Sequence, residues 1–238
     1  MKRILFFLFL IGAAMTAQAQ TADEILAKSF EALGGVDKWK TLKTTKMEGN
    51  MSMQGFEFPG TIFAATPNRQ RVEVSVQGNS IVQAFDGQNA WWINPFSGST
   101  EAQLMPDEMA ASLKDFQFQN ELIDYAAKGH AVALEGKETV EGAETFKLKL
   151  TKKNGDVEYH FIDSETYAPI MIRTTAKAGP TKGQVAETFM SDYQEVNGMM
   201  FPFFMETKAG GQSLQKITIK SIKLDEAYED SLFLFPKK

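Results

Sequence analysis

The sequence contains no cysteine and only two histidines among its 238 residues. The lack of cysteine excludes disulfide bridges, thiolate metal sites and cysteine nucleophiles. A chain of this length buries roughly 70–75% of the surface that it exposes when unfolded, so it can fold without disulfide bridges. We therefore expect a domain that relies on its own apolar core.

Runs of one charge sign are also missing, and the net charge is only −5. This balance excludes the basic footprint of a nucleic-acid-binding protein and gives no strong attraction to an anionic bilayer. What the chain does have is 19 phenylalanines and 12 methionines. Methionine adapts to irregular or variable partners, although an ordinary core would also use it.

The N-terminus is typical of a secretory signal peptide. Lys2 and Arg3 precede an apolar run at 4–14, and Ala17 and Ala19 form a cleavage site. A membrane anchor is the alternative, but the run is short and lacks a stop-transfer flank. We predict a signal peptide at 1–19, export to the periplasm and a single domain at 20–238. Because Gln20 and not cysteine follows the cleavage site, we expect no lipid anchor.

A helix is predicted directly after the leader. Thr21 and Glu24 have the spacing of a capping box, and the pair Gly34-Gly35 ends the helix. Between them, apolar residues recur at helical spacing: Ala22, Leu26, Phe30 and Leu33. The helix therefore has one face that must dock on an apolar surface, and Trp39 and Leu42 follow on a short second turn.

Beyond residue 44 the apolar residues alternate with polar ones, which predicts strands with one buried face. Turn pairs such as Pro67-Asn68, Asp86-Gly87 and Asn154-Gly155 separate these strands at intervals too short for parallel crossovers. We count about eleven or twelve strands in one meandering, curved antiparallel sheet.

Helical spacing returns once, in the middle of the chain. Pro106 suits a first helical position. Around it, apolar residues recur at helical intervals, at Met105, Met109, Leu113 and Phe116. With the stretch 119–128, this predicts one or two short helices between two sets of strands. These helices either plug the hollow of the sheet completely or leave a ligand cavity beneath them, and the sequence leaves both arrangements open.

No pattern of catalytic residues is present. The sequence has no nucleophile elbow, phosphate loop or dinucleotide fingerprint, and His130 and His160 lack metal-ligand spacing. His160 alternates with Tyr159 and Phe161, so we expect an exposed or hydrogen-bonded strand histidine. Asp163 and Glu165 fit turn chemistry better than an acid–base pair. We expect neither an enzyme nor a cofactor.

The order of motifs resembles a known family. Segment 60–96 passes through the Pro67-Asn68 turn, the Asp86-Gly87 turn and the aromatic strand at 91–96, which ends in Asn94-Pro95. The C-terminal part carries Ser191-Asp192-Tyr193, Asn197-Gly198, Phe201-Pro202 and the closing stretch 233–236. In this order the chain, over nearly all of 21–236, resembles the LolA-like periplasmic lipoprotein carriers and the wider group of outer-membrane lipoprotein-sorting proteins.

The resemblance implies an incomplete antiparallel barrel with a helical lid over an apolar hollow that takes acyl chains. It implies a lipid or acylated lipoprotein as cargo, with sorting partners at the inner and outer membranes. Family carriers have an arginine directly before the Pro-Asn turn, which latches the lid, and this chain has Thr66 there. The resemblance therefore supports lipid binding in general more than lipoprotein cargo in particular.

Strand alternation within this scheme assigns the side chains of the hollow, although a single bulge would invert a strand. The predicted lid residues are Met109, Leu113 and Phe116. The predicted cavity lining is Met51, Met53, Phe58, Ile62, Val72, Val74, Trp91, Phe146, Leu148 and Phe161.

Two other functions fit the same scaffold. A ligand-sensing or protein-interaction module would use the fold without transferring cargo, and fold alone does not separate these roles. An enzyme would need a pocket with convergent polar groups, which the sequence does not display.

Overall fold

The structure, a computed structural model, describes residues 20–53, 55–177 and 181–236. The predicted signal peptide at 1–19 lies outside the described residues. Within the described part, no helix is both long enough and apolar enough to cross a membrane.

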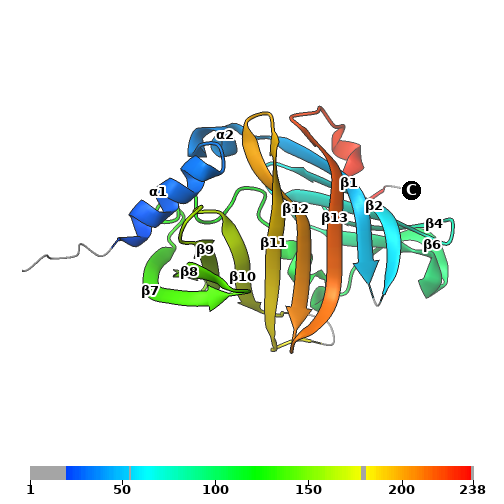
Figure 1. Cartoon of the computed structure of the whole chain (residues 1–238). Coiled ribbons are helices and arrows are strands. Elements are labelled where there is room, and N and C mark those ends of the chain that lie inside the picture. The colour runs from blue at the N-terminus through cyan, green and yellow to red at the C-terminus, as the bar shows by residue number, and fades with distance from the viewer. Residues whose placement is uncertain (1–19, 54, 178–180, 237–238) are drawn as a thin grey trace, which may run out of the picture.

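One curved antiparallel sheet makes up most of the described chain (Figure 1), which confirms the predicted fold class. It has thirteen strands, slightly more than predicted. Their bounds are β1 Thr44–Met53, β2 Phe56–Ala65, β3 Arg69–Val76, β4 Asn79–Phe85, β5 Ala90–Asn94, β6 Ser99–Leu104, β7 Ala131–Val140, β8 Ala143–Thr151, β9 Val157–Asp163, β10 Pro169–Thr175, β11 Val185–Val196, β12 Met199–Ala209 and β13 Gln212–Leu224.

The sheet is built from two meanders that meet in its middle. Strands β1 to β6 pair in sequence order, as do β7 to β13, and β1 pairs with β13. Met47 lies opposite Ile222 and Met51 opposite Ile217 in that central pair. The prediction of a single meander missed this pairing, which joins residues nearly the whole chain apart. As a result, β6 and β7 are the two outer edges of the sheet.

The first helix, α1 (Ala22–Ala32), begins at the predicted capping box. Thr21 Oγ1 accepts from the Glu24 amide at 3.2 Å, and the Glu24 carboxylate accepts from the Thr21 amide at 3.0 Å. Its apolar stripe docks on the sheet (Figure 1) and buries a cluster made of Ile25, Leu26, Phe30, Leu33, Leu122, Ile123, Phe146, Leu148, Leu150 and Ile162.

The end of α1 is fixed on the β11–β12 hairpin. Leu33 O accepts a hydrogen bond from the Met200 amide, and Gly34 packs directly on the carbonyl of Gly198. Gly34 has a φ of 97°, which only glycine adopts without strain. The second helix, α2 (Val36–Thr41), follows at once, and Trp39 Nε1 donates to Leu33 O at 3.0 Å.

The connection between the edge strands β6 and β7 carries the predicted helical insertion. Helix α3 (Asp107–Lys114) is present, and Ala110 packs with Leu113 against Phe85 and Ala90. One helix is therefore present of the one or two that were predicted, and the stretch 119–128 is a series of turns. Asp124 has a φ of 51°, which interrupts any helical run there.

The docking of Gly34 gives a test of the fold. A Cβ on Gly34 would lie 2.2 Å from Gly198 O, whereas a Cβ on Gly35 would meet nothing within 4 Å. Both residues have positive φ. We expect Gly34→Ala to lower the free energy of unfolding by at least about 3 kcal/mol, because the helix end must move off the hairpin. Gly35→Ala should cost only about 1–2 kcal/mol from backbone strain.

Urea unfolding followed by circular dichroism measures both values. Equal losses in the two variants would contradict the close docking of α1 on the hairpin.

Candidate functional site

We call the face of the sheet that packs against the helices the inner face. Phe85, which contacts α3, and Leu148, which contacts α1, both belong to it. The strand register connects these two positions and places most of the predicted lining residues on the same face. They are Met51, Phe58, Ile62, Val72, Val74, Phe146 and Leu148.

Burial of these residues falls into two classes. Met51, Phe146 and Leu148 are buried, and the last two lie under α1. Phe58, Ile62, Val72 and Val74 are only half-buried, on the part of the inner face formed by β2 and β3. That half of the inner face therefore keeps apolar surface that the described part of the chain does not cover fully. The side chain of Met53 lies outside the described part of the structure.

Two predicted lining residues lie on the opposite, outer face. Trp91 is buried there, and its Nε1 donates to Phe233 O in the C-terminal segment at 2.8 Å. Trp92 takes the inner position, since neighbours in a strand alternate. Phe161 packs on the outer face with Val140 and Met171, and its neighbours on β9 point inward instead.

The predicted lid residues also differ in their surroundings. Leu113 packs on the inner face through α3, and Phe116 lines a hollow there with Gln70. Met109 is 47% exposed. The insertion thus covers the inner face with only part of its apolar surface.

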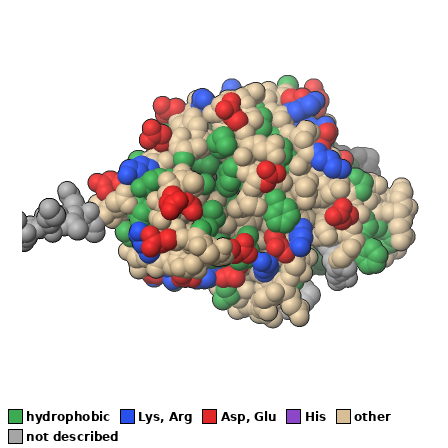
Figure 2. All heavy atoms as spheres, viewed as in Figure 1, with side chains coloured by type: hydrophobic (Ala, Val, Ile, Leu, Met, Phe, Trp, Pro, Cys, Tyr) green, Lys and Arg blue, Asp and Glu red, His purple; other side chains and the backbone are tan. Residues whose placement is uncertain are grey.

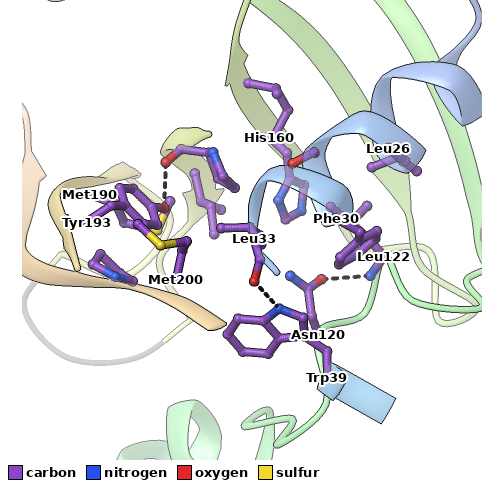
Figure 3. A pocket seen from close by; sticks show the side chains of 15 residues that line it. Leu26, Phe30, Leu33, Trp39, Asn120, Leu122, His160, Met190, Tyr193 and Met200 are labelled. Atoms are coloured by element: carbon purple, nitrogen blue, oxygen red, sulfur yellow. Dashed lines mark hydrogen bonds between the residues drawn. The ribbon is translucent and has the colours of Figure 1, made fainter. Parts of the chain in front are cut away.

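An apolar cavity of about 130 Å³ lies between α1 and strands β9 to β12 (Figure 3). A dry cavity of about 150 Å³ is known to hold one benzene ring, so this space accepts only the end of a hydrocarbon chain. Its walls are Leu26, Ser29, Phe30, Leu33, Trp39, Asn120, Leu122, His160, Ile162, Pro169, Ile172, Met190, Tyr193, Met200 and Pro202.

A more open groove of about 410 Å³ adjoins this cavity. The two spaces share Leu33, Met190, Tyr193 and Met200 as a common wall. The groove continues past the end of α1 along Ala32 and Ile170. Figure 2 shows hydrophobic side chains gathered on the surface between α1 and β11. Cavity and groove together form a narrow apolar site, which we call the α1 site.

None of the predicted lining or lid residues is among the residues that line the α1 site. The apolar face of α1 was identified as a docking surface, but alternation does not reveal which strands it meets. Tyr193 lies in the wall with its hydroxyl donating to Pro169 O at 2.6 Å, and burial raises its pKa. Asp192, with a φ of 53°, breaks the alternation just before it, so no periodic signal marks its face.

His160 lies in the cavity wall and corrects the prediction made for it. It is only 6% exposed, and its Nε2 has no hydrogen-bond partner. The nearest group is the Glu158 carboxylate, whose Oε2 is 3.3 Å away without the alignment of a hydrogen bond. A histidine at this point was expected to be exposed or hydrogen-bonded, and the structure shows neither.

A chain of ion pairs begins next to His160 and ties the insertion to the sheet. Lys152 Nζ lies 2.5 Å from Glu158 Oε1 and also contacts the carboxylate of Glu121 in the 115–130 segment. Burial alone would raise the pKa of Glu158. The neighbouring His160 and Lys152 lower this pKa by a larger amount, so that its value is about 2. The Glu158 carboxylate is therefore charged throughout the physiological range.

The fold has counterparts among solved structures. A LolA superfamily protein from Nitrosomonas europaea is 12% identical and superposes with a TM-score of 0.59, covering 91% of this chain and 98% of that one. A Vibrio parahaemolyticus domain described as an outer-membrane lipoprotein-sorting protein is 10% identical, with a TM-score of 0.58 and coverage of 88% and 94%. A DUF1329 family protein from Desulfovibrio piger is 14% identical, with a TM-score of 0.51 and coverage of 88% and 97%.

At these identities the likeness concerns the fold alone, and it agrees with the fold that the sequence resemblance implied. No family model matches the sequence. No curated protein matches it either.

The lowered pKa of Glu158 predicts a loss of stability in acid. Its ordinary value is 4.5 and its folded value is about 2, so its contribution is complete above pH 4.5 and disappears as the pH falls towards 2. The ionised carboxylate contributes about 3 kcal/mol to the free energy of unfolding. We therefore expect the wild type to lose about 3 kcal/mol of stability relative to Glu158→Gln as the pH falls from 6 to 2.5.

Urea titrations at several pH values measure this difference. Glu195→Gln, which changes an exposed carboxylate, is the control and should run parallel to the wild type. A constant gap between Glu158→Gln and the wild type would show that the ion pairs do not set the acid stability.

Proposed function

We propose that this chain is an exported periplasmic carrier that binds a lipid, or an acyl chain of a lipoprotein, in the apolar space beneath its helices. The observation that carries the proposal is the α1 site, a cavity that opens into an apolar groove of about 410 Å³. An ordinary core would be closed at this point, since protein interiors leave few voids larger than a water molecule.

The inner face supports the same function. Its half-buried apolar residues on β2 and β3 lie on a curved sheet, and the connection between β6 and β7 crosses from one open edge of that sheet to the other. Each buried methylene contributes about 0.8 kcal/mol, so one long acyl chain offers on the order of 10 kcal/mol before ordering costs. Methionines in the wall, such as Met190 and Met200, adapt to chains of different shape.

The fold counterparts favour a carrier over an enzyme. Two of the three are described as LolA superfamily or lipoprotein-sorting proteins. In the proposed role the chain takes its cargo at the inner membrane, shields it in the periplasm and delivers it for outer-membrane sorting. The reaction is reversible binding, and no covalent step is assigned to any residue.

The direct test is whether the protein holds lipid. We expect the chain purified from a periplasmic extract to release acyl lipids into organic solvent, as identified by mass spectrometry. The delipidated protein should then bind the apolar probe N-phenyl-1-naphthylamine and transfer a labelled acyl lipid between vesicles. Absence of both lipid and probe binding would refute the carrier. Binding without any transfer would instead favour a ligand-sensing module.

A filling substitution tests the location of the site. Met190 lines both the cavity and the groove, whereas Val185 begins the same strand and is 53% exposed. We expect Met190→Trp to weaken probe binding at least about tenfold, because the indole occupies the shared wall. Val185→Trp should bind as the wild type does. Circular dichroism confirms folding of both variants, and equal affinities would place the ligand elsewhere.

A further inference from the structure

On strands β8 to β10 the inner face becomes polar towards one end. Glu158 is the next inward residue after His160 on β9, and Thr174 is the next after Ile172 on β10. Leu150, opposite Glu158, is still apolar, and Lys152 follows just past the end of β8. A second hollow of about 430 Å³ lies on the polar side, between these strands, Gln70 of β3 and Phe116 of the insertion. His160 in the cavity wall and Glu158 in the wall of this hollow occupy successive inward positions on β9.

His160 marks the boundary between the two spaces. Figure 3 shows its imidazole directed into the space between Phe30 and Asn120. Its buried Nε2 makes no aligned hydrogen bond, although the Glu158 carboxylate lies 3.3 Å away, and native proteins seldom leave such a group unpaired. Neither Asn120 nor any other residue of the cavity wall supplies the missing bond within the described part of the chain. A polar group on a ligand in the cavity would supply it.

The charges around the polar hollow indicate which polar group fits. Lys152 is shared between the carboxylates of Glu121 and Glu158. Lys177 is shared between Asp115, at 2.5 Å, and Asp156, at 2.6 Å. Each lysine lining the hollow therefore already faces two carboxylates, and none is left to neutralise an anionic ligand. A carboxylate ligand would meet excess negative charge in a partly desolvated place, at an electrostatic cost.

We propose that the α1 site takes a single-chain amphiphile with an uncharged, hydrogen-bonding head, such as an ester-linked glycerol, and that His160 binds this head. The hydrocarbon chain lies in the cavity and along the groove past the end of α1. The inference rests on the proposed function and deepens it, because it names the class of ligand and its orientation.

The test compares two ligands with the same C16 chain, 1-monopalmitoylglycerol and palmitate. Each displaces N-phenyl-1-naphthylamine from the delipidated protein at pH 8, below its aggregation threshold. We expect the uncharged monoacylglycerol to bind at least tenfold more tightly than palmitate. Equal affinities, or tighter binding of palmitate, would overturn the inference and leave the carrier function standing. If the protein binds neither ligand nor the probe, the carrier function itself fails.

A substitution then tests the role of His160. We expect His160→Leu to weaken monopalmitoylglycerol binding about threefold to tenfold, the effect of one neutral hydrogen bond, while palmitate and the probe bind as before. His160→Gln, which can still donate a hydrogen bond, should keep most of the preference. His130→Gln is the matched control, because its imidazole accepts from the Lys153 amide outside the cavity wall.

A folded His160→Leu protein with an unchanged preference for the monoacylglycerol would remove His160 from the site. If this variant does not fold, the comparison of the two ligands on the wild type still decides whether the head must be uncharged.

Discussion

The pairing of β1 with β13 is the constraint on which the rest of the molecule depends. It joins two meanders into one sheet and so places β6 and β7 at opposite edges. The chain must then cross from one edge to the other between residues 104 and 131, and it does so over the inner face. The covering insertion is thus a consequence of the strand order, and the ion pair between Glu121 and Lys152 fixes where it lies.

The same geometry leaves the inner face incompletely covered. Helix α1 closes the part formed by β8 and β9, and α3 closes the ends of β4 and β5. Between them, residues such as Ile62 and Val72 stay half-buried. Closing this surface with larger side chains would stabilise the fold by about 25 cal/mol for each Å² removed from water. A carrier has to forgo part of that stability, because its ligand uses the same surface.

Much of the fold could be predicted from the sequence because its signals are local. Alternation and turn pairs located the strands, and the Thr21–Glu24 capping box located α1. The β1–β13 pair could not be predicted in this way, since nothing local distinguishes a partner many residues away. The sequence left open whether 119–128 forms a second helix, because the left-handed conformation of Asp124 that interrupts it leaves no mark in the sequence.

The candidate site was less predictable for a related reason. Which face a strand turns inward depends on register, and a shift of one residue exchanges the two faces. The register places Met51 and Leu148 on the inner face, but it places Trp91 and Phe161 on the outer face, where the C-terminal segment and β7 cover them. The polar inward residue His160, next to Phe161, was the better guide to the site.

The size of the cavity bears on how a ligand could be released. About 130 Å³ holds only the end of a chain, so most of a bound hydrocarbon would lie in the groove beside the end of α1. That helix end is held by the close contact of Gly34 with Gly198 and by the Met200–Leu33 hydrogen bond. The end of α1 is therefore a fixed part of the groove lining, which also contains flexible side chains such as Met190. In the proposed function, entry and exit of a chain would require movement of these side chains and would leave the docked helix in place.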